Sequence, residues 1–326
     1  PGPEDHVLKK GSEKGEMNRI RRIINFGQKK DRTGAGRFHG AWVLFAENTI
    51  GRIGLFLLAF FGIMALTSFI PPLIDPMYHP MTGVDPDISN VTPPSLTHWL
   101  GTDYMGRDLF SQLLTGARVA FMVGVSAAFI SIVFGTVIGM AAGYGGGIID
   151  TLLMRLADMV MVMPSLLVVL LLSSLFGKLN IWIIVLLIAL FRWPGVSRVI
   201  RSQTLSLKER PFIDAAVIAG ASHMRILFRH IAPNVLPMAL LFMTFRVTSA
   251  IIIEAVLAFL GFGDPSTVSW GMMLQWVWKT GHMFQAPYWL LPPGICISLI
   301  TLSFYMIGRA MEEVLDPRLR KEGDTE

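Results

Sequence analysis

The segment that decides the fold is Pro211–Pro237, PFIDAAVIAGASHMRILFRHIAPNVLP, a polar and basic stretch between two long apolar regions. Pro211 suits the first turn of a helix, because the N–H that proline lacks would be unpaired there anyway. Four residues share one face of this helix at the spacing i, i+3, i+4 and i+7: Phe212, Ala215, Ala216 and Ala219. Gly220 stands where glycine commonly follows a helix end.

A second helix is predicted directly after this turn. Ser222 can cap its N-terminus, and the helical pattern continues to about Ile231. A short helix with a small-residue face can enter a groove on a partner protein. The same pattern also suits a hairpin that only connects two membrane spans, so spacing alone leaves both interpretations open.

The composition is that of a membrane protein. The chain has 326 residues, of which 52% are hydrophobic and 16% charged, whereas soluble domains carry about 25% charge. The formal net charge of +5 does not indicate a nucleic-acid partner, because the basic residues concentrate beside apolar segments. Cys296 is the only cysteine, so no disulfide within the chain can form.

Six membrane-spanning helices are expected, which predicts an all-α polytopic fold. They are expected at Ile53–Ile74, Val119–Ala142, Ile149–Phe176, Ile181–Ile200, Asn234–Phe259 and Tyr288–Gly308. Pro71 and Pro72 are expected to end the first helix. Turns are expected at Gly143–Gly147 and at Gly177–Asn180.

The distribution of basic residues predicts the orientation. The loop Arg198–Arg229 holds six Lys or Arg residues, and the loop Leu260–Pro287 holds only Lys279. Basic loops stay in the cytoplasm, so both chain ends are predicted to be cytoplasmic. The predicted organisation is a cytoplasmic tail (1–50), a transmembrane domain (51–312) and a second tail (313–326). The transmembrane domain would carry an outer loop (72–117) and a cytoplasmic hairpin (205–235).

The first tail contains a basic stretch, Met17–Phe26, that can form an amphipathic helix on an anionic membrane surface or remain a solvated tail. In the outer loop, four residues could suggest a cation site: Asp75, Asp85, Asp87 and Asn90. Their spacing does not fit an EF-hand, and Asp-Pro pairs form ordinary turns, so no metal site is expected. His79 and His98 lack a partner at zinc spacing and are interpreted as surface or packed histidines.

The end of this loop, His98–Phe121, predicts a structured cap or an ordinary turn beside the second span. Gly101 and Gly106 free the backbone for turns. A local network of ion pairs is expected among Asp103, Arg107 and Asp108.

Several charged residues fall inside predicted spans, where charges usually face protein or water. In the third span, Arg155 and Asp158 stand at i and i+3 and can pair. Arg246 and Glu254 are about 12 Å apart along one helix and cannot pair directly. Glu254 could line a translocation path, hold an outer gate, or accept hydrogen bonds from loop N–H groups. Arg192 and Arg246 could snorkel or pair with a partner subunit.

The segment Pro211–Pro237 resembles the coupling motif of binding-protein-dependent ABC importer permeases. Asp214-Ala215-Ala216 and Gly220 match its EAA and Gly positions, with Asp in place of Glu, and Pro233 matches its final proline. His230 and Ala232 depart from the general pattern but fit the R-H-I-x-P-N form, Arg229–Asn234, of the peptide-type branch. The resemblance implies that this hairpin docks on an ATP-hydrolysing subunit.

A second resemblance is specific to the dipeptide/oligopeptide/nickel branch of these permeases. Its G-T-D-x-x-G-R-D and G-A-R signature matches Gly101-Thr102-Asp103, Gly106-Arg107-Asp108 and Gly116-Ala117-Arg118. Gln112 stands where that branch usually has Arg. Four further segments also resemble this branch: Met154–Pro164, Glu254–Gly263, Ser269-Trp270-Gly271 and Leu315–Arg320.

The resemblance implies a type I ABC importer permease, one half of a path for short peptides. It implies a homologous second permease, two ATP-binding subunits that hold ATP and Mg, and an external binding protein. Oligosaccharides or nickel chelates remain alternative ligands. The chain has no phosphate-binding loop, since Gly177-Lys178 is followed by Leu179, and no catalytic or metal cluster, so no enzyme is expected. An alternative of another class is a self-sufficient transporter or channel with Arg246 and Glu254 as an ion relay; no internal repeat supports it.

Overall fold

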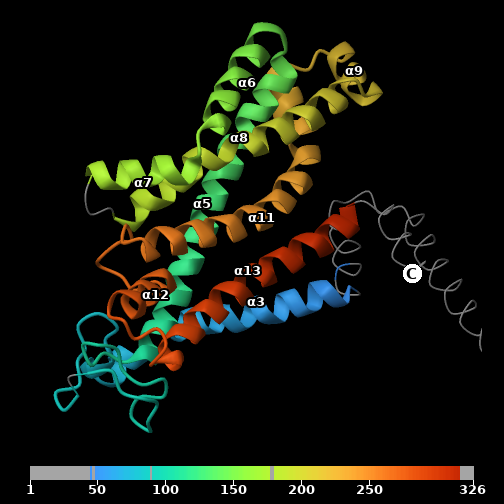
Figure 1. Cartoon of the computed structure of the whole chain (residues 1–326). Coiled ribbons are helices and arrows are strands. Elements are labelled where there is room, and N and C mark those ends of the chain that lie inside the picture. Colours follow the sequence, from blue (N-terminus) through green and yellow to red (C-terminus); the bar gives the residue numbers. More distant parts are fainter. Residues whose placement is uncertain (1–44, 46–47, 89, 177–179, 316–326) are drawn as a thin grey trace, which may run out of the picture. The chain divides into compact units, whose positions relative to one another are not determined.

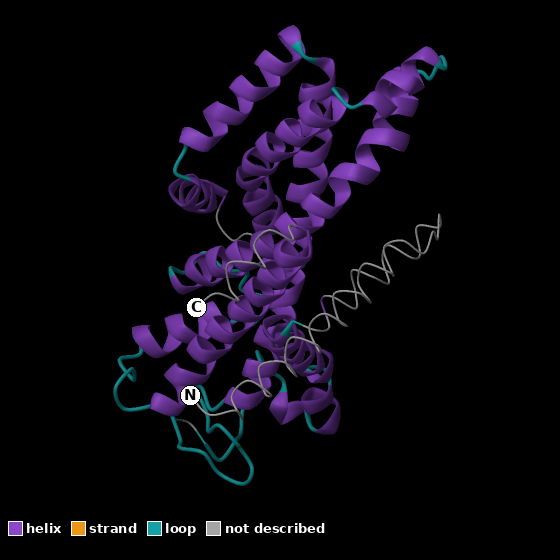
Figure 2. Ribbon diagram, turned by 90° about the vertical axis from the view of Figure 1, so that its right-hand side faces the viewer, coloured by secondary structure: helices purple, strands orange, loops and turns teal. Residues whose placement is uncertain are grey.

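The computed structural model describes residue 45 and residues 48–88, 90–176 and 180–315. Residues from Asn48 onward form one compact unit, and the fold described below belongs to it. These described residues form helices and connecting loops without strands (Figure 2). The expected amphipathic helix Met17–Phe26, the turn residues 177–179 and most of the tail 313–326 lie outside the described residues.

Long helices dominate this unit (Figure 1). They are α3 (Thr49–Thr67), α5 (Leu109–Gly145), α6 (Gly147–Val162), α7 (Ser165–Phe176), α8 (Ile181–Lys208), α11 (Ala232–Phe259) and α13 (Pro287–Leu315). The shorter elements are α4 (Ile70–Ile74), η1 (Pro76–Tyr78), α9 (Pro211–Ile218), α10 (His223–Arg225), the π-helical turn η2 (Ile226–Ile231) and α12 (Trp270–Lys279). Five helices are long and apolar enough to cross a membrane, and the pair α6–α7 makes a sixth span if it counts as one.

The first span ends at Ile74, as the sequence predicted, but its helix is interrupted before the prolines. Helix α3 stops at Thr67, before the prolines that were expected to end it. Pro71 and Pro72 instead lie in the first turn of α4. Proline is tolerated there because the first turn of a helix leaves its N–H groups unpaired.

The second span, α5, is longer than predicted at both ends. It begins at Leu109, where the Asp108 side chain accepts a hydrogen bond from the N–H of Ser111, and it continues to Gly145. The final residues of the expected outer loop 72–117 are therefore helical. Only Gly146, with φ of 63°, separates α5 from α6, so the five-residue glycine turn expected at 143–147 is wrong. With 37 residues, α5 is about 55 Å long.

The third span is not the single helix that the sequence predicted. Helices α6 and α7 are bent by 77° at a short break. Pro164 explains the break: it offers no N–H, and it holds the preceding Met163 in an extended conformation with ψ of 125°. The expected pair of Asp158 with Arg155 is wrong as well, because Asp158 pairs with Arg198 of α8.

Helices α5 and α8 form the most closely packed pair in the bundle. Three glycines of α5, one turn apart, face the α8 backbone. A Cβ on Gly135, Gly139 or Gly143 would lie 2.5–2.8 Å from a carbonyl oxygen of α8. The small residues let the two backbones approach closely, as is common between membrane helices.

The last two spans also extend beyond their predicted bounds. No break separates the second helix of the hairpin from the fifth span, since His223–Phe259 continues through η2 into α11. The loop after it contains α12, which the sequence analysis did not predict. The sixth span, α13, continues past Gly308 to Leu315.

Candidate functional site

The hairpin formed by α9 and α10 lies at one end of the bundle, beyond the end of α8 (Figure 1). Helix α9 begins at Pro211, as the sequence predicted, and carries Asp214 in its first turn. A carboxylate there faces the positive end of the helix dipole and stabilises the helix start. Ser222 caps α10 through its hydroxyl oxygen, which accepts from the N–H of Arg225.

The turn between the two helices is a Schellman motif. The N–H of Ala221 donates to the carbonyl of Ala216, and the N–H of Gly220 donates to that of Val217. Gly220 has φ of +76°, the left-handed conformation that glycine adopts without strain. A Cβ at this position would meet no atom within 4 Å, so the backbone angle and not crowding favours glycine here.

One side of α9 is anchored in the bundle and the other is open. Ile213 is only 3% exposed and packs with Ile226 and Ile231. Ala216 is half-buried against the same cluster, so the predicted face is not uniformly open. The open face consists of the exposed residues Pro211, Phe212, Asp214, Ala215, Val217, Ile218, Ala219 and Gly220. Ile218 is 86% exposed and was missed by the sequence analysis.

The hairpin is tied to the end of α5. The Tyr144 hydroxyl lies 2.8 Å from Nδ1 of His223, and the two rings meet edge to face. The Lys208 ammonium donates to the Tyr144 carbonyl at 3.0 Å and lies 5.6 Å from the centre of the tyrosine ring. These contacts join α10 to the end of α5, and the end of α5 to the end of α8.

The opposite end of α5 carries a compact loop, residues 75–108, which we call the cap (Figure 1). Asp103 is fully buried. One of its oxygens accepts from the N–H groups of Met105 and Arg107, and the other accepts from the Arg107 guanidinium at 2.7 Å and from Gln112 at 2.9 Å. The i,i+4 ion pair that the sequence predicted is confirmed for Asp103 and Arg107. The Arg107 guanidinium also lies 4.3 Å from the ring centre of Trp276 in α12.

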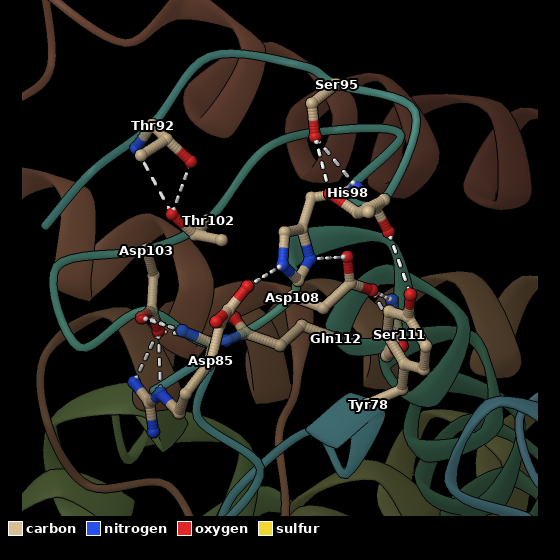
Figure 3. A network of polar contacts seen from close by, with 12 residues as sticks. Tyr78, Asp85, Thr92, Ser95, His98, Thr102, Asp103, Asp108, Ser111 and Gln112 are labelled. Carbon is tan, nitrogen blue, oxygen red and sulfur yellow. Dashed lines mark hydrogen bonds and ion pairs between the residues drawn. The ribbon is translucent and has the colours of Figure 1, made fainter. Parts of the chain in front are cut away.

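Asp108 does not join that ion pair, contrary to the prediction. It accepts from the Ser111 N–H and hydroxyl and lies 2.9 Å from His98 (Figure 3). The other ring nitrogen of His98 lies 3.3 Å from Asp85, so the buried imidazole bridges two carboxylates. The pKa of Asp85 lies below its ordinary value, chiefly because the Asp87 N–H donates to it, and also because His98 contacts it.

The remaining motif glycines allow close contacts in the cap. A Cβ on Gly101 or Gly106 would lie 2.2 Å from a loop carbonyl oxygen, and both residues have positive φ. Thr102 holds the other side of this turn, because its hydroxyl lies 2.8 Å from that of Thr92 (Figure 3). Arg118, the last residue of the predicted motif, lies inside α5 with its guanidinium 4.2 Å from the centre of the Phe69 ring.

Motif segments that lie far apart in the sequence meet beside the cap. The Trp270 indole packs directly on Gly116 and donates to the carbonyl of Leu113 at 2.9 Å. Gly271 allows equally close contact with the backbone of Ala255. Helix α12 is thereby fixed against both α5 and α11.

The two charged residues of α11 have separate environments, as their spacing predicted. Glu254 is buried, 6% exposed, and its carboxylate contacts the side chain of Ser269 at the start of α12. The contact is with a side chain and not with the loop N–H groups that were one of the three open alternatives for Glu254. Arg246 extends toward α8, where its Nη2 packs against Gly195.

Within the described residues, no group of three or more His, Cys, Asp or Glu side chains could hold a metal ion. In the cap, Asp75 and Asp85 accept hydrogen bonds from the N–H groups two residues further along the chain. His79 contacts the hydroxyl of Thr82. These side chains serve as local turn and cap contacts.

A family model described as "Binding-protein-dependent transport system inner membrane component" matches residues 135–321. The chain belongs to this family. The dipeptide transport system permease protein DppC of Bacillus subtilis is 35% identical over 285 residues, 86% of each chain. The oligopeptide transport system permease protein OppC of Haemophilus influenzae is 35% identical over 280 residues, which are 85% of this chain and 87% of that protein. OppC of Bacillus subtilis is 33% identical over 283 residues, which are 86% of this chain and 90% of that protein.

Family membership confirms the main predictions from the sequence. This family member is a multi-pass membrane component of a binding-protein-dependent transport system and has the type I ABC importer permease fold. The resemblance to the dipeptide/oligopeptide branch is confirmed by the relatives.

Proposed function

We propose that this permease subunit forms half of the path of an ATP-driven importer and that α9 couples the path to an ATP-binding subunit. The supporting observation is the hairpin geometry. A short helix is anchored by Ile213 and leaves Phe212, Ala215 and Ile218 exposed on its surface. An exposed apolar helix face of this kind suits a groove on a partner.

The open face of α9 is suited to transmit force. Ile213 ties α9 to the bundle, and the Tyr144–His223 contact ties α10 to α5. A displacement of α9 would therefore be passed on to the ends of α5 and α8. ATP and Mg would be held by two partner subunits, and closure of that pair would draw together the α9 helices of the two permeases. The spans would then switch from inward-open to outward-open.

The substrate class that we propose is short peptides. The support comes from relatives that are named as dipeptide and oligopeptide permeases and that align over 85–86% of this chain. Oligosaccharides and nickel chelates are alternatives that the same architecture could serve. The second permease would be homologous and not identical, and an external binding protein would deliver the ligand.

We propose an orientation with both termini and the α9 hairpin in the cytoplasm and the cap outside. The basic residues of Arg198–Arg229 support it, because such loops remain on the cytoplasmic side. The cap network around Asp103 and Asp108 would then form a rigid rim at the outer mouth, suited to receive the binding protein.

Reconstitution tests this function. The purified complex in liposomes should take up a labelled tripeptide only when the binding protein and ATP are both supplied. Uptake by this chain alone, driven by an ion gradient, would favour the alternative of a self-sufficient transporter. Uptake of an oligosaccharide or a nickel chelate in place of peptides would replace the proposed substrate class.

A further inference from the structure

Two arginines lie near the middle of neighbouring spans. Arg192 is about 17 Å from the start of α8 at Ile181, and Arg246 is about 21 Å from the start of α11 at Ala232. Because the hydrocarbon layer is about 30 Å thick, both side chains are placed close to its mid-depth.

The two arginines lie on facing sides of their helices. Gly195 follows Arg192 by three residues on α8 and so shares its face. A Cβ on Gly195 would lie 2.6 Å from Nη2 of Arg246. Because Gly195 has no side chain, the space beside it is free for the Arg246 guanidinium. The Arg246 guanidinium thus lies against the face of α8 that also carries Arg192.

Neither guanidinium has a carboxylate partner in the described part of the chain. The Nε atoms of Arg192 and Arg246 are buried without a hydrogen-bond partner there. Arginines near the hairpin end of the bundle differ in this respect, since Arg198 pairs with Asp158 and Arg201 with Asp150. No hydrogen bond to the Nη atoms of either arginine is found among the described residues.

Two like charges at this depth require an anion, and the described residues supply none. An ionised side chain is not stable against lipid, and it faces a protein interior or a water-filled path. Arginine presents a planar fork of N–H donors that matches the two oxygens of a carboxylate. The pair is thus suited to a ligand with a single carboxylate group.

We propose that Arg192 and Arg246 form a carboxylate site on the translocation path, which takes the C-terminal carboxylate of a peptide in transit. The proposal rests on the proposed function as a peptide permease and names the part of the peptide that is bound. Every unmodified peptide carries this group ionised at neutral pH, so the site recognises the ligand class and not its sequence. An uncharged oligosaccharide lacks the group.

The test uses trialanine and its C-terminal amide as probes. The complete complex is reconstituted with its binding protein, and the binding protein is saturated with either peptide before uptake is measured. The wild type is expected to move the acid about tenfold faster than the amide, as one lost charge-assisted contact implies. Arg192→Gln and Arg246→Gln should bring this ratio close to one by slowing only the acid, and the Lys variants should keep part of it.

Arg155→Gln is the matched control, because Arg155 is an exposed arginine of α6, and it should keep the wild-type ratio. An unchanged acid-to-amide ratio in both Gln variants would overturn the proposal. Equal slowing of both peptides, or loss of the second permease from the complex in both the Gln and the Lys variants, would also overturn it, because either result indicates pairing with an acid of the partner. If the wild type transports neither peptide, the result contradicts the proposed function as a peptide permease, and not the carboxylate site alone.

Discussion

The hydroxyl of Tyr144 lies 2.8 Å from Nδ1 of His223, which links the end of α5 to the first residue of α10. Through α5, the hairpin at one end is joined to Asp108 and the cap at the other, over about 55 Å. A rigid helix of this length can carry a displacement between the two ends, which is what the proposed transport cycle requires.

Removing that hydroxyl should weaken the hairpin without unfolding it. Tyr144→Phe keeps the ring beside His223 and Lys208 but loses one hydrogen bond, worth about 1 kcal/mol. We expect a small fall in the temperature of unfolding of the purified complex and a reduced yield of transport per ATP hydrolysed. Tyr144→Ala should be worse in both measurements, and equal effects of the two variants would argue against a role for the hydroxyl.

Gly220→Val should uncouple ATP hydrolysis from uptake. The variant must hold φ of +76°, which costs a β-branched residue about 1–2 kcal/mol, although the space around the Cβ is open. The Schellman turn should open and shift the face of α9, while the subunit stays in the membrane. ATPase activity and peptide uptake, measured on the same proteoliposomes, check the expectation.

Gly281→Val is the control for that strain. Gly281 has φ of +75° and equally open space, but it lies between α12 and α13, in the segment that we assign to the outside. Its variant should keep the coupling ratio of the wild type. Similar uncoupling in both variants would mean that general destabilisation, and not the hairpin, is being measured.

Sequence reasoning predicted the helical hairpin because its signals are local. Pro211, Gly220 and Ser222 each act within one turn, and each was found in its predicted role. The i,i+4 pair of Asp103 and Arg107 is local as well. The contact of His98 with Asp85 was missed because Asp85 is thirteen residues away and is brought to it only by the path of the loop.

Proline shows a second limit of sequence reasoning. Pro164 breaks the third span, whereas Pro194 and Pro237 lie inside helices α8 and α11 that continue. Neighbouring helices in a membrane can satisfy the backbone groups that a proline leaves free. A proline in an apolar run therefore does not by itself decide between a break and a continuous span.

Arg107→Ala should destabilise the cap by about 3–5 kcal/mol, because it leaves the fully buried Asp103 without its countercharge. The cap of this variant should be cut faster in limited proteolysis. The response of the complex to the binding protein should also weaken. Asp87→Asn, at an exposed position of the same loop, is the control and should behave as the wild type. Wild-type protease resistance in Arg107→Ala would contradict the network.

The cap should also lose stability in acid. The pKa of Asp85 is depressed in the folded protein, so its contribution is present above the ordinary Asp value of about 3.9 and is lost as the pH falls through the depressed value. Protease resistance of the cap should therefore decline only at strongly acidic pH. Asp85→Asn should reduce that decline, and an identical pH profile in wild type and variant would contradict the assignment.

The proposed orientation can be checked with cysteine labels. Thr82 in the cap and Ser222 in the hairpin are both exposed. After replacement of Cys296 by Ala, Thr82→Cys should react with an impermeant maleimide from outside, and Ser222→Cys only after the membrane is opened. The reverse pattern would contradict the orientation.

Cross-linking from the open face of α9 tests the central claim most directly. Ile218→Cys places a thiol at a position that is 86% exposed, and Phe284→Cys places one at 91% exposure near the other end of the bundle. We predict that Ile218→Cys forms a short-range cross-link to the ATP-binding subunit in the assembled complex and that Phe284→Cys does not. An intact complex in which Ile218→Cys and Phe212→Cys both fail to cross-link to that subunit would contradict the docking of α9.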